Sequence, residues 1–426
     1  MIPALVQWEL TERCNYRCQH CYRLDTTGAP GPAQELSDGQ MWQIARKLIE
    51  NRLFFVTLTG GEPLVRKNLA VDLCRFLTEN GVRVSLNTNL LLMDEVSFGK
   101  FQLRGLLISC PSANPVLYRL VTGNGDYRRF ERKLKFVLSS AAHCTVNMVV
   151  NRLNLGDIRA TALKLAKLGV KSFAATPVSL NPRAPRPDLL LSLEELRGVL
   201  EDLIWVNQEL GLEVDVMEAL PKCAIPVRAF ELKLPFIGRS CFAGKRNGTI
   251  SPAGEVRPCG HNPNSFGNIL KEEVSDIWER LGNWRENTGN HHRNCLACDI
   301  QSSCDGGCRF SGHPQDPSAV TVQKYLEVSP ASNRCSAQIL FTPQTIVRPY
   351  RQILARREGD NWLLCSNSPR NLLTVNQDLY GFILQTRQIQ PTAIADLAEN
   401  FGSNFNDPDF QSVMTTLISK SYFLVC

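Results

Sequence analysis

Three cysteines lie close together near the amino terminus, in the run Cys14-Asn-Tyr-Arg-Cys18-Gln-His-Cys21-Tyr22. Cysteine thiolates are the usual ligands of iron-sulfur clusters, and a four-iron cube takes four of them. Three thiolates at this spacing can hold three irons of such a cube and leave the fourth iron open to a small molecule. The run therefore indicates a cluster that takes part in chemistry, because a cluster that only stores an electron needs no open iron.

A second motif follows the next apolar segment. Residues 5–10 and 53–58 are apolar runs that predict strands. The cysteine run follows the first of them, and Gly60, Gly61, Glu62 and Pro63 follow the second. A Gly-Gly-Glu-Pro segment alone is often an ordinary turn, but the two motifs in this order resemble the radical S-adenosylmethionine (SAM) enzymes. In that family the cluster loop follows the first barrel strand, and the Gly-Gly-Glu-Pro turn binds the amino group of SAM.

The same resemblance implies further contacts with SAM. Polar residues after the third predicted strand would reach the ribose, with helix capping as the alternative role; they are Ser85, Asn87, Thr88 and Asn89. After the fourth strand, Ser109 and Arg119 would hold the SAM carboxylate, because an arginine fork matches a carboxylate. Many relatives have aspartate after that serine, whereas this chain has Cys110.

Two residues of the cysteine run itself are further candidates for binding SAM. His20 stands where the family commonly has an aromatic residue near the adenine, and an ordinary loop histidine is the alternative. Tyr22, directly after Cys21, is the second candidate.

From residue 4 to about 215, short apolar segments alternate with amphipathic ones, which predicts an α/β fold with a parallel sheet wrapped by helices. The predicted strands are residues 5–10, 53–58, 82–87, 106–109, 145–150 and 172–176, and the predicted helices include residues 38–51, 66–80 and 157–168. Six units suit the partial (β/α)6 TIM-like barrel of the radical SAM family. Both motifs fall at the carboxyl ends of strands, where such barrels place their catalytic groups.

Cysteines recur beyond residue 220, as Cys241, Cys259, Cys295, Cys298, Cys304, Cys308 and Cys335. This arrangement resembles the SPASM extension of radical SAM enzymes, which carries two auxiliary iron-sulfur clusters. The resemblance implies one cluster on Cys295, Cys298, Cys304 and Cys335, and the other on Cys241, Cys259 and Cys308. Cys223 is a candidate fourth ligand of the latter, and a site left open for the substrate is the alternative. Zinc is the alternative metal, because a Cys-x2-Cys pair with two further cysteines can hold a tetrahedral ion.

The segment after about residue 341 has a different pattern. It predicts a hairpin over residues 345–367 that turns at residues 358–360, a strand at 372–375, and helices at 378–388, 392–401 and 409–419. Residues 371–384 are similar to the PqqD-like winged-helix domains that capture a leader peptide by adding it as a strand to a sheet edge. A winged helix can instead bind DNA, but residues 341–426 contain seven basic and seven acidic residues, without the basic excess that phosphate contacts need.

The composition is that of a globular protein, with 43% hydrophobic and 21% charged residues and a modest net charge of +6. The start of the chain lacks a secretion signal, and no apolar run approaches the roughly 18 residues of a membrane helix. Sixteen cysteines without export favour metal ligands over disulfides. We therefore expect a cytoplasmic protein that binds neither membranes nor nucleic acid.

Together these features predict three domains: a radical SAM partial barrel (residues 1–215), a SPASM domain (216–340) and a PqqD-like domain (341–426). The resemblance implies SAM and three [4Fe-4S] clusters as cofactors, and a flavodoxin or ferredoxin as reductant. The expected activity is modification of a ribosomally made precursor peptide with a leader, by an intramolecular carbon–carbon, thioether or ether cross-link. The alternatives are a sulfatase-type or other protein maturase and a metal-binding peptide or DNA scaffold without turnover.

Overall fold

The computed structural model describes residues 3–22, 35–140, 143–179, 186–287, 307–308, 310, 342–350, 352–366, 372–387, 389–420 and 422–425. Two compact units divide the chain, Met1–Asn333 and Arg334–Cys426. Within the described residues, no helix is both long and apolar enough to cross a membrane.

The first unit is built on one nine-stranded sheet with the order β7-β6-β5-β4-β3-β2-β1-β8-β9. Neighbouring strands are parallel, except for the antiparallel pair β8 and β9. The strands are β1 (Leu5–Glu9), β2 (Phe55–Thr59), β3 (Arg83–Thr88), β4 (Gly105–Ser109), β5 (Cys144–Val150), β6 (Ser172–Pro177), β7 (Glu213–Asp215), β8 (Asn247–Ile250) and β9 (Val256–Arg257). All six predicted strands are present, so the predicted parallel α/β fold is confirmed. Strands β7, β8 and β9 were not predicted.

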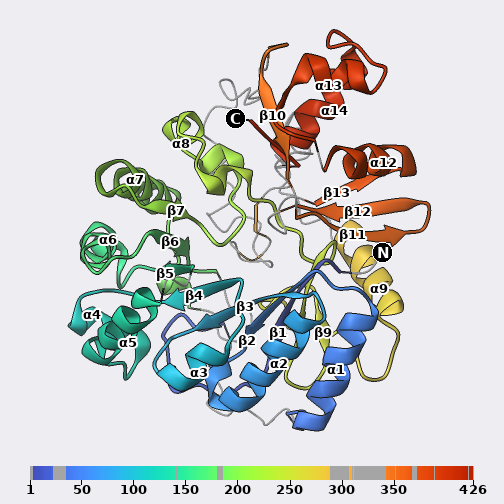
Figure 1. The fold of residues 1–426 in the computed structure, drawn as a ribbon. Helices are drawn as coiled ribbons and strands as arrows, with labels where there is room; N and C mark the ends of the chain where they lie inside the picture. The colour runs from blue at the N-terminus through green and yellow to red at the C-terminus, as the bar shows by residue number, and fades with distance from the viewer. Residues whose placement is uncertain are drawn as a thin grey trace. The chain divides into compact units, whose positions relative to one another are not determined.

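Helices cover the outer side of this sheet, which curves around a common centre (Figure 1). They are α1 (Asp38–Glu50), α2 (Lys67–Glu79), α3 (Glu95–Lys100), α4 (Pro115–Thr122), α5 (Tyr127–Ser139), α6 (Ile158–Lys167), α7 (Leu193–Leu210), α8 (Val227–Glu231) and α9 (Val274–Asn287). Capping boxes begin two of them: Ser37 with Gln40 at α1, and Ser192 with Glu195 at α7. Such a box satisfies backbone donors that the first turn leaves unpaired.

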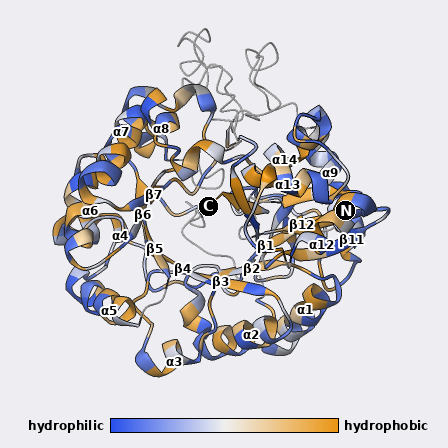
Figure 2. Cartoon of the chain, turned by 45° about the horizontal axis from the view of Figure 1, so that its top comes forward, coloured by the Kyte–Doolittle hydropathy of each residue, from blue (hydrophilic) through white to orange (hydrophobic). Residues whose placement is uncertain are grey.

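The two faces of the sheet differ in polarity because strand side chains alternate between them. In β3, Val84 and Leu86 are buried in the core that the helices complete, whereas Ser85 and Asn87 are only half-buried. At the end of β4, Ser109 is exposed. Figure 2 shows apolar residues, in orange, along the strands and on the helix sides turned to them. Polar side chains of β3 and β4 therefore face the concave side of the sheet.

The described residues of the second unit form two antiparallel three-stranded sheets and three helices. One sheet has the order β14-β10-β15 and the other β11-β12-β13. Their bounds are β10 (Ile346–Pro349), β11 (Leu354–Glu358), β12 (Asn361–Cys365), β13 (Leu372–Val375), β14 (Thr392–Ala393) and β15 (Phe423–Val425), and the helices are α12 (Gln377–Thr386), α13 (Ile394–Asn400) and α14 (Pro408–Ser419). A separate core that includes Leu364, Ile383, Leu397 and Met414 holds them together.

The predicted hairpin of the second unit is shorter than expected. Its strands are β11 and β12, and Gly359 takes a positive φ of 60° in the turn between them. The first residues of the predicted range form β10, which pairs instead with β14 and with β15 near the carboxyl terminus. Strands β14 and β15 lie more than 40 residues after β10 in the sequence. The local sequence pattern around β10 therefore could not predict this pairing. The strand predicted at residues 372–375 is present with the same bounds, and the three predicted helices are present with ends that differ by at most two residues.

Candidate metal centres

The cysteine loop between β1 and α1 brings Cys14, Cys18 and Cys21 near one another. Burial raises the pKa of the Cys14 thiol to about 11, and the negative charges of Glu62 and Cys21 add to this effect. Burial also raises the pKa of Cys18, followed by the charges of Cys21 and Cys14. Three thiols that repel one another when ionised favour a bound metal cation, which stabilises all three thiolates.

The Gly-Gly turn holds the start of this loop by direct backbone contact. The amide of Gly61 donates to the carbonyl oxygen of Thr11 at 2.7 Å, and the amide of Glu62 donates to that of Arg13 at 2.9 Å. A Cβ atom on Gly60 would lie 2.6 Å from the Thr11 oxygen, and one on Gly61 would lie 2.6 Å from the Glu12 oxygen. Both glycines are therefore needed for close packing against the cysteine loop.

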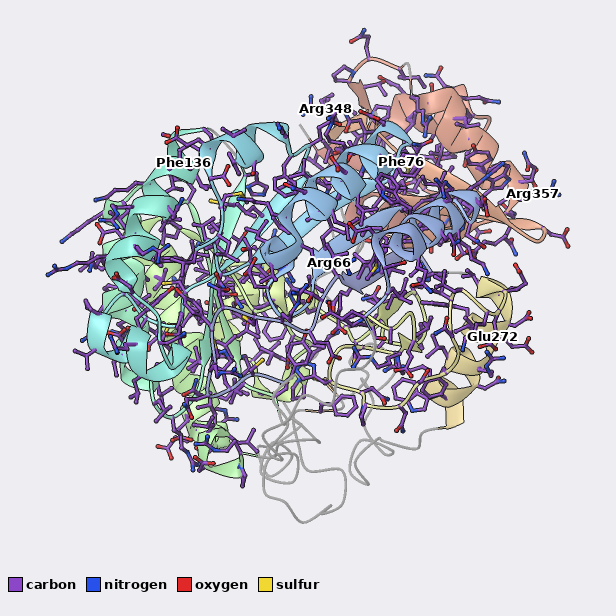
Figure 3. The ribbon with its side chains drawn as sticks, turned by 90° about the horizontal axis from the view of Figure 1, so that it is seen from below. Arg66, Phe76, Phe136, Glu272, Arg348 and Arg357 are labelled. Carbon is purple, nitrogen blue, oxygen red and sulfur yellow. The ribbon has the colours of Figure 1, made fainter. Side chains whose placement is uncertain are left out.

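Arg66 supports the same loop from the start of α2 (Figure 3). Its guanidinium donates to the carbonyl oxygen of Leu10 at 2.9 Å and pairs with Asp38 at 2.5 Å. Pro63 is buried in the 3-10 turn that leads to Arg66. The turn and the start of α2 thus fix the chain where it leaves β1.

Glu62 is buried and its carboxylate accepts three hydrogen bonds. The donors are Thr88 Oγ1 at 2.7 Å, the amide of Asn89 at 2.8 Å and the amide of Leu64 at 3.1 Å. Burial raises the pKa of Glu62 to about 7, although these bonds act in the opposite direction. A cationic group beside Glu62 would remove this cost, as the ammonium group of SAM would do.

The predicted ribose segment divides into two pairs. Ser85 and Asn87 face the concave side of the sheet. The hydroxyl of Thr88 donates a hydrogen bond to Glu62, and the side chain of Asn89 donates to Asn15 of the cysteine loop at 2.8 Å. The second pair therefore links the loop to Glu62, and only the first pair is turned toward the concave face.

Ser109 and Arg119 are both exposed, Ser109 at the end of β4 and Arg119 on α4. No ion pair of Arg119 occurs within the described ranges, and no described contact joins it to Ser109. Their predicted role toward the SAM carboxylate stays a prediction.

His20 has a buried ring nitrogen, Nδ1, that has no hydrogen-bond partner among the described residues. Burial lowers its pKa to about 4, so the ring is neutral near pH 7. The side-chain nitrogen of Asn15 is also buried, and no group in the described part of the chain accepts a hydrogen bond from it. Two unpartnered polar atoms within the cysteine loop fit a polar ligand at this place, as SAM requires.

A second set of cysteines converges from three separate segments. Cys241 lies before β8, Cys259 after β9, and Cys308 far along the chain. Burial raises the pKa of Cys259 to about 12, with the charge of Cys241 as the next cause. Burial likewise raises the pKa of Cys308, followed by the charges of Glu218 and Cys241.

Hydrogen-bond donors surround the sulfur atoms of this second set. Arg285 of α9 is buried and donates to Cys241 Sγ at 3.4 Å and to the Cys241 carbonyl oxygen at 2.8 Å. The amide of Phe310 donates to Cys308 Sγ at 3.4 Å. Donors of this kind stabilise thiolates and tune an iron-sulfur cluster.

Several predicted ligands cannot be placed. Cys295, Cys298, Cys304 and Cys335 lie outside the described residues, as does the side chain of Cys223. Among the described side chains, no three of the types that bind metals converge closely enough to hold one ion. Thiolates on a cube bind one iron each, so they are spread more widely than the ligands of a single ion.

The two cysteine sets are joined by Tyr22, which was predicted as a site residue, and by others that sequence reasoning missed. Glu9 of β1 and Arg257 of β9 form a buried ion pair, and Tyr22 donates to Glu9 at 3.5 Å. The Tyr22 ring also packs against His261, with centroids 5.0 Å apart. Glu9 was the one indication in the sequence, because a charged residue within an apolar strand is buried and therefore needs a partner of opposite charge.

Glu218 is a further missed residue beside the second set. It accepts a hydrogen bond from Ser179 Oγ at 2.5 Å and lies 3.8 Å from His261 Nε2. Neither residue type nor spacing marked it in the sequence.

Comparisons with known proteins agree with these two sites. Residues 8–166 match the Radical SAM superfamily, and residues 241–299 match SPASM, described as an iron-sulfur cluster-binding domain. An AdoMet-dependent heme synthase of Methanosarcina barkeri is 24% identical over 344 residues, 77% of this chain and 95% of that protein. The subtilosin biosynthesis protein AlbA of Bacillus subtilis is 27% identical over 325 residues, 73% of this chain and 68% of that protein.

Solved structures show the same fold. Streptococcus suis SuiB, bound to its precursor peptide SuiA, has a TM-score of 0.56 at 17% identity and covers 72% of each chain. SuiB bound to SAM has a TM-score of 0.60 and covers 75% of this chain and 76% of that one. The two matched domains imply SAM and iron-sulfur clusters as cofactors. The chain therefore carries a radical SAM domain followed by a SPASM domain, and it is a radical SAM enzyme.

Proposed function

We propose that this enzyme modifies a ribosomally made precursor peptide and forms an intramolecular carbon–carbon, thioether or ether cross-link in it. The observation that carries the proposal is the convergence of two cysteine sets on one continuous sheet, in which β1 leads into the first set and β8, its parallel neighbour, follows Cys241 of the second. AlbA is a biosynthesis protein for the bacteriocin subtilosin, and SuiB binds a precursor peptide. Similarity to both supports a peptide as substrate.

The residues of the first site would each have a part in binding SAM. Cys14, Cys18 and Cys21 hold three irons of the SAM cluster, and Glu62 receives the ammonium group of SAM. Ser85 and Asn87 face the ribose, His20 and Tyr22 lie near the adenine, and Ser109 with Arg119 holds the carboxylate. When bound, SAM and the cluster supply a 5′-deoxyadenosyl radical that abstracts a hydrogen atom from the peptide. The glycines 60 and 61 keep the loop fixed while this occurs.

Two auxiliary clusters complete the proposed cofactors. Cys295, Cys298, Cys304 and Cys335 hold one of them, and Cys241, Cys259 and Cys308 hold the other. Cys223 is the proposed fourth ligand of the latter. The amide of Cys308 donates to the carbonyl oxygen of Ala219 at 2.9 Å, and Gly307 packs closely on Pro221. These contacts bring the chain just before Cys223 to Cys308, which supports this choice.

The second unit is the proposed PqqD-like domain that recognises the leader. Among the described strands, β11 and β13 each pair on one side only, so each offers an edge to an added peptide strand. Trp362 of β12 stacks on Tyr380 of α12 with centroids 4.0 Å apart, which fixes the helix on the sheet. A leader peptide bound to this unit raises the effective concentration of the attached peptide that is to be modified.

The remaining parts of the proposal concern partners and location. A cytoplasmic flavodoxin or ferredoxin supplies electrons, and neither membrane nor nucleic acid takes part. The equal numbers of acidic and basic residues in the segment 341–426 support peptide over DNA as its partner.

A second candidate is a radical SAM enzyme with a small-molecule substrate. Similarity to an AdoMet-dependent heme synthase over 95% of that protein favours it. Such an enzyme needs no leader-binding edge, so binding of a leader peptide by the full chain separates the two candidates.

The deciding experiment uses the full chain, reconstituted with iron and sulfide under anaerobic conditions. We expect SAM and dithionite to give 5′-deoxyadenosine, and a peptide encoded by a short gene beside this one to lose two hydrogen atoms, as mass spectrometry would show. The Cys14/Cys18/Cys21→Ala variant should do neither. Peptides that stay unmodified while 5′-deoxyadenosine accumulates, and fail to bind the enzyme, would favour the small-molecule candidate.

A further inference from the structure

Helix α5 presents an unusually basic outer face. Its 13 residues include five lysines and arginines and a single glutamate, Glu131, which pairs with Lys135 at 2.8 Å. Arg128 and Arg132 are exposed one turn apart, and neither has a carboxylate partner within the described ranges. The basic residues gather on one face of the helix, but other residues separate them in the sequence, so they do not form a continuous run of lysine and arginine.

Helix α4 packs beside α5 and adds exposed apolar residues (Figure 1). Val116 and Leu120, one turn apart, are 75% and 50% exposed. We call the exposed side chains Val116 and Leu120 of α4 and Arg128 and Arg132 of α5 the α4–α5 face. A small apolar patch bordered by basic residues is typical of surfaces that form transient complexes with an acidic partner.

The first cysteine loop lies directly beneath these helices. The amide of Arg17 donates to the carbonyl oxygen of Thr122 at 3.0 Å, and the amide of Gln19 donates to that of Val121 at 2.9 Å. A Cβ atom on Gly123 would lie 2.8 Å from the Arg17 oxygen, so only glycine permits this approach. The end of α4 and the cysteine loop are therefore in backbone contact.

A cluster of aromatic rings fills the same layer. Tyr16, between Cys14 and Cys18, meets Tyr118 of α4 with hydroxyl oxygens 3.2 Å apart. Tyr118 packs on Tyr127 and Phe130 of α5 at ring distances of 5.6 and 5.5 Å. The amide of Tyr16 also donates to Cys14 Sγ at 3.4 Å. One layer of packed rings thus separates the α4–α5 face from the cysteine loop and holds the two at a fixed spacing.

We propose that the α4–α5 face is the docking site of an acidic one-electron carrier protein that reduces the cluster held by Cys14, Cys18 and Cys21. In each encounter the reduced flavin or iron-sulfur centre of the carrier loses one electron and the cluster gains it, and no bond is made or broken. Complementary charge speeds such encounters and orients the partners. The inference rests on the cluster assignment of the proposed function.

An acidic peptide substrate is the competing occupant of a basic face. It is disfavoured by position, because α4 and α5 cover the outer side of the sheet. Ser85, Asn87 and the other polar strand residues face the concave side. A peptide bound at the α4–α5 face would have the sheet between it and those residues, whereas an electron carrier needs only to come near the cysteine loop.

The test compares two double variants of the full, reconstituted enzyme. Arg128→Glu/Arg132→Glu reverses the docking charges, and Arg46→Glu/Lys271→Glu reverses two exposed basic residues on and near other helices. SAM cleavage is driven either by reduced flavodoxin, an acidic carrier, or by dithionite, which needs no docking. We expect the ratio of flavodoxin-driven to dithionite-driven 5′-deoxyadenosine to fall by at least about tenfold in the first variant only.

Binding of labelled flavodoxin, followed by fluorescence anisotropy, gives a readout that needs no turnover. Affinity should weaken in the first variant and with added salt, because exposed charges are screened. Equal ratios and equal affinities in the two variants would overturn the proposal, as would weaker binding of the precursor peptide alone in the first variant. A wild type that cleaves no SAM even with dithionite would refute the cluster assignment, while the anisotropy measurement would still decide the docking face.

Discussion

The two cysteine sites of this chain differ in how they are assembled. The first lies in one short loop after β1, and backbone contacts with the Gly60–Gly61 turn and the end of α4 hold that loop from two sides. The second collects Cys241, Cys259 and Cys308 from segments far apart in the chain, and it depends in part on the buried side chain of Arg285, which donates to Cys241. We therefore expect the first site to fail when a larger side chain fills the space at Gly61. We expect the second site to weaken when the hydrogen-bond donor Arg285 is removed.

The glutamates beside the two sites also differ in their hydrogen-bond partners. Glu62, beside the first site, is buried and accepts three hydrogen bonds from the chain. Glu218, beside the second, accepts from Ser179 and faces His261. Burial raises the pKa of Glu62 to about 7, so we expect its proton to respond to a cationic ligand.

The largest effect is expected from Gly61→Ala. The new Cβ would lie 2.6 Å from the carbonyl oxygen of Glu12, and backbone cannot move aside as a flexible side chain would. Overpacking of this kind costs about 1–3 kcal/mol or more, and the strain falls on the loop that carries Cys14. We expect loss of the first cluster, roughly four irons per chain, together with all SAM-dependent change in the electron paramagnetic resonance spectrum.

A matched control keeps this result specific. Gly99→Ala adds the same methyl group at a helix position where, apart from the adjacent residues and the backbone of the helix itself, no described atom lies within 4 Å of the new Cβ. It should retain full iron content and SAM cleavage. If Gly61→Ala also keeps its iron, the backbone contact does not hold the first site, and the proposed contrast between the sites is wrong.

Arg285→Leu is the corresponding change at the second site, with an intermediate effect. It removes the donor to Cys241 Sγ and to the Cys241 carbonyl oxygen. Hydrogen bonds to charged groups are worth about 1.5–3 kcal/mol, so loss of iron to a chelator should become about tenfold faster or more. The spectrum of the first cluster with SAM should not change.

Arg280→Leu is the control on the same helix. Arg280 is exposed and pairs with Glu272 at 2.5 Å, away from the cysteines. Iron release from this variant should match the wild type. Equal release from Arg285→Leu and Arg280→Leu would mean that Arg285 does not stabilise the second site.

Sequence patterns predicted the first site and the six main strands because both are local. Cys14, Cys18 and Cys21 lie within eight residues, and each of the six strands is an apolar run. Strand β7 contains two acidic residues among its three and carries no apolar signal. Arg285 looks like any polar residue of an amphipathic helix, and only the fold shows that it is buried beside Cys241. Pairing of β8 with β1, which brings the second site to the first, depends on contacts more than 240 residues apart.

The smallest expected effect is a pH dependence of SAM binding. Without SAM, burial raises the pKa of Glu62 from 4.5 to about 7. The neutral carboxyl group stabilises the folded chain below about pH 4.5, and this contribution is lost as the pH rises through 7. The ammonium group of SAM favours the ionised form, so SAM binding below pH 7 should release a proton, and affinity should rise by up to about tenfold per pH unit.

Calorimetry in two buffers with different heats of ionisation, at about pH 6 where Glu62 is mostly protonated, counts the protons released. Glu218→Gln should release as many as the wild type, because Glu218 belongs to the second site, whereas Glu62→Gln should release none and bind SAM more weakly. Proton release that persists in Glu62→Gln would assign it to another group. It would also remove the electrostatic reason for placing the ammonium group of SAM at Glu62, leaving that carboxylate to hold Thr88 and the amide of Asn89 in place beside the cysteine loop.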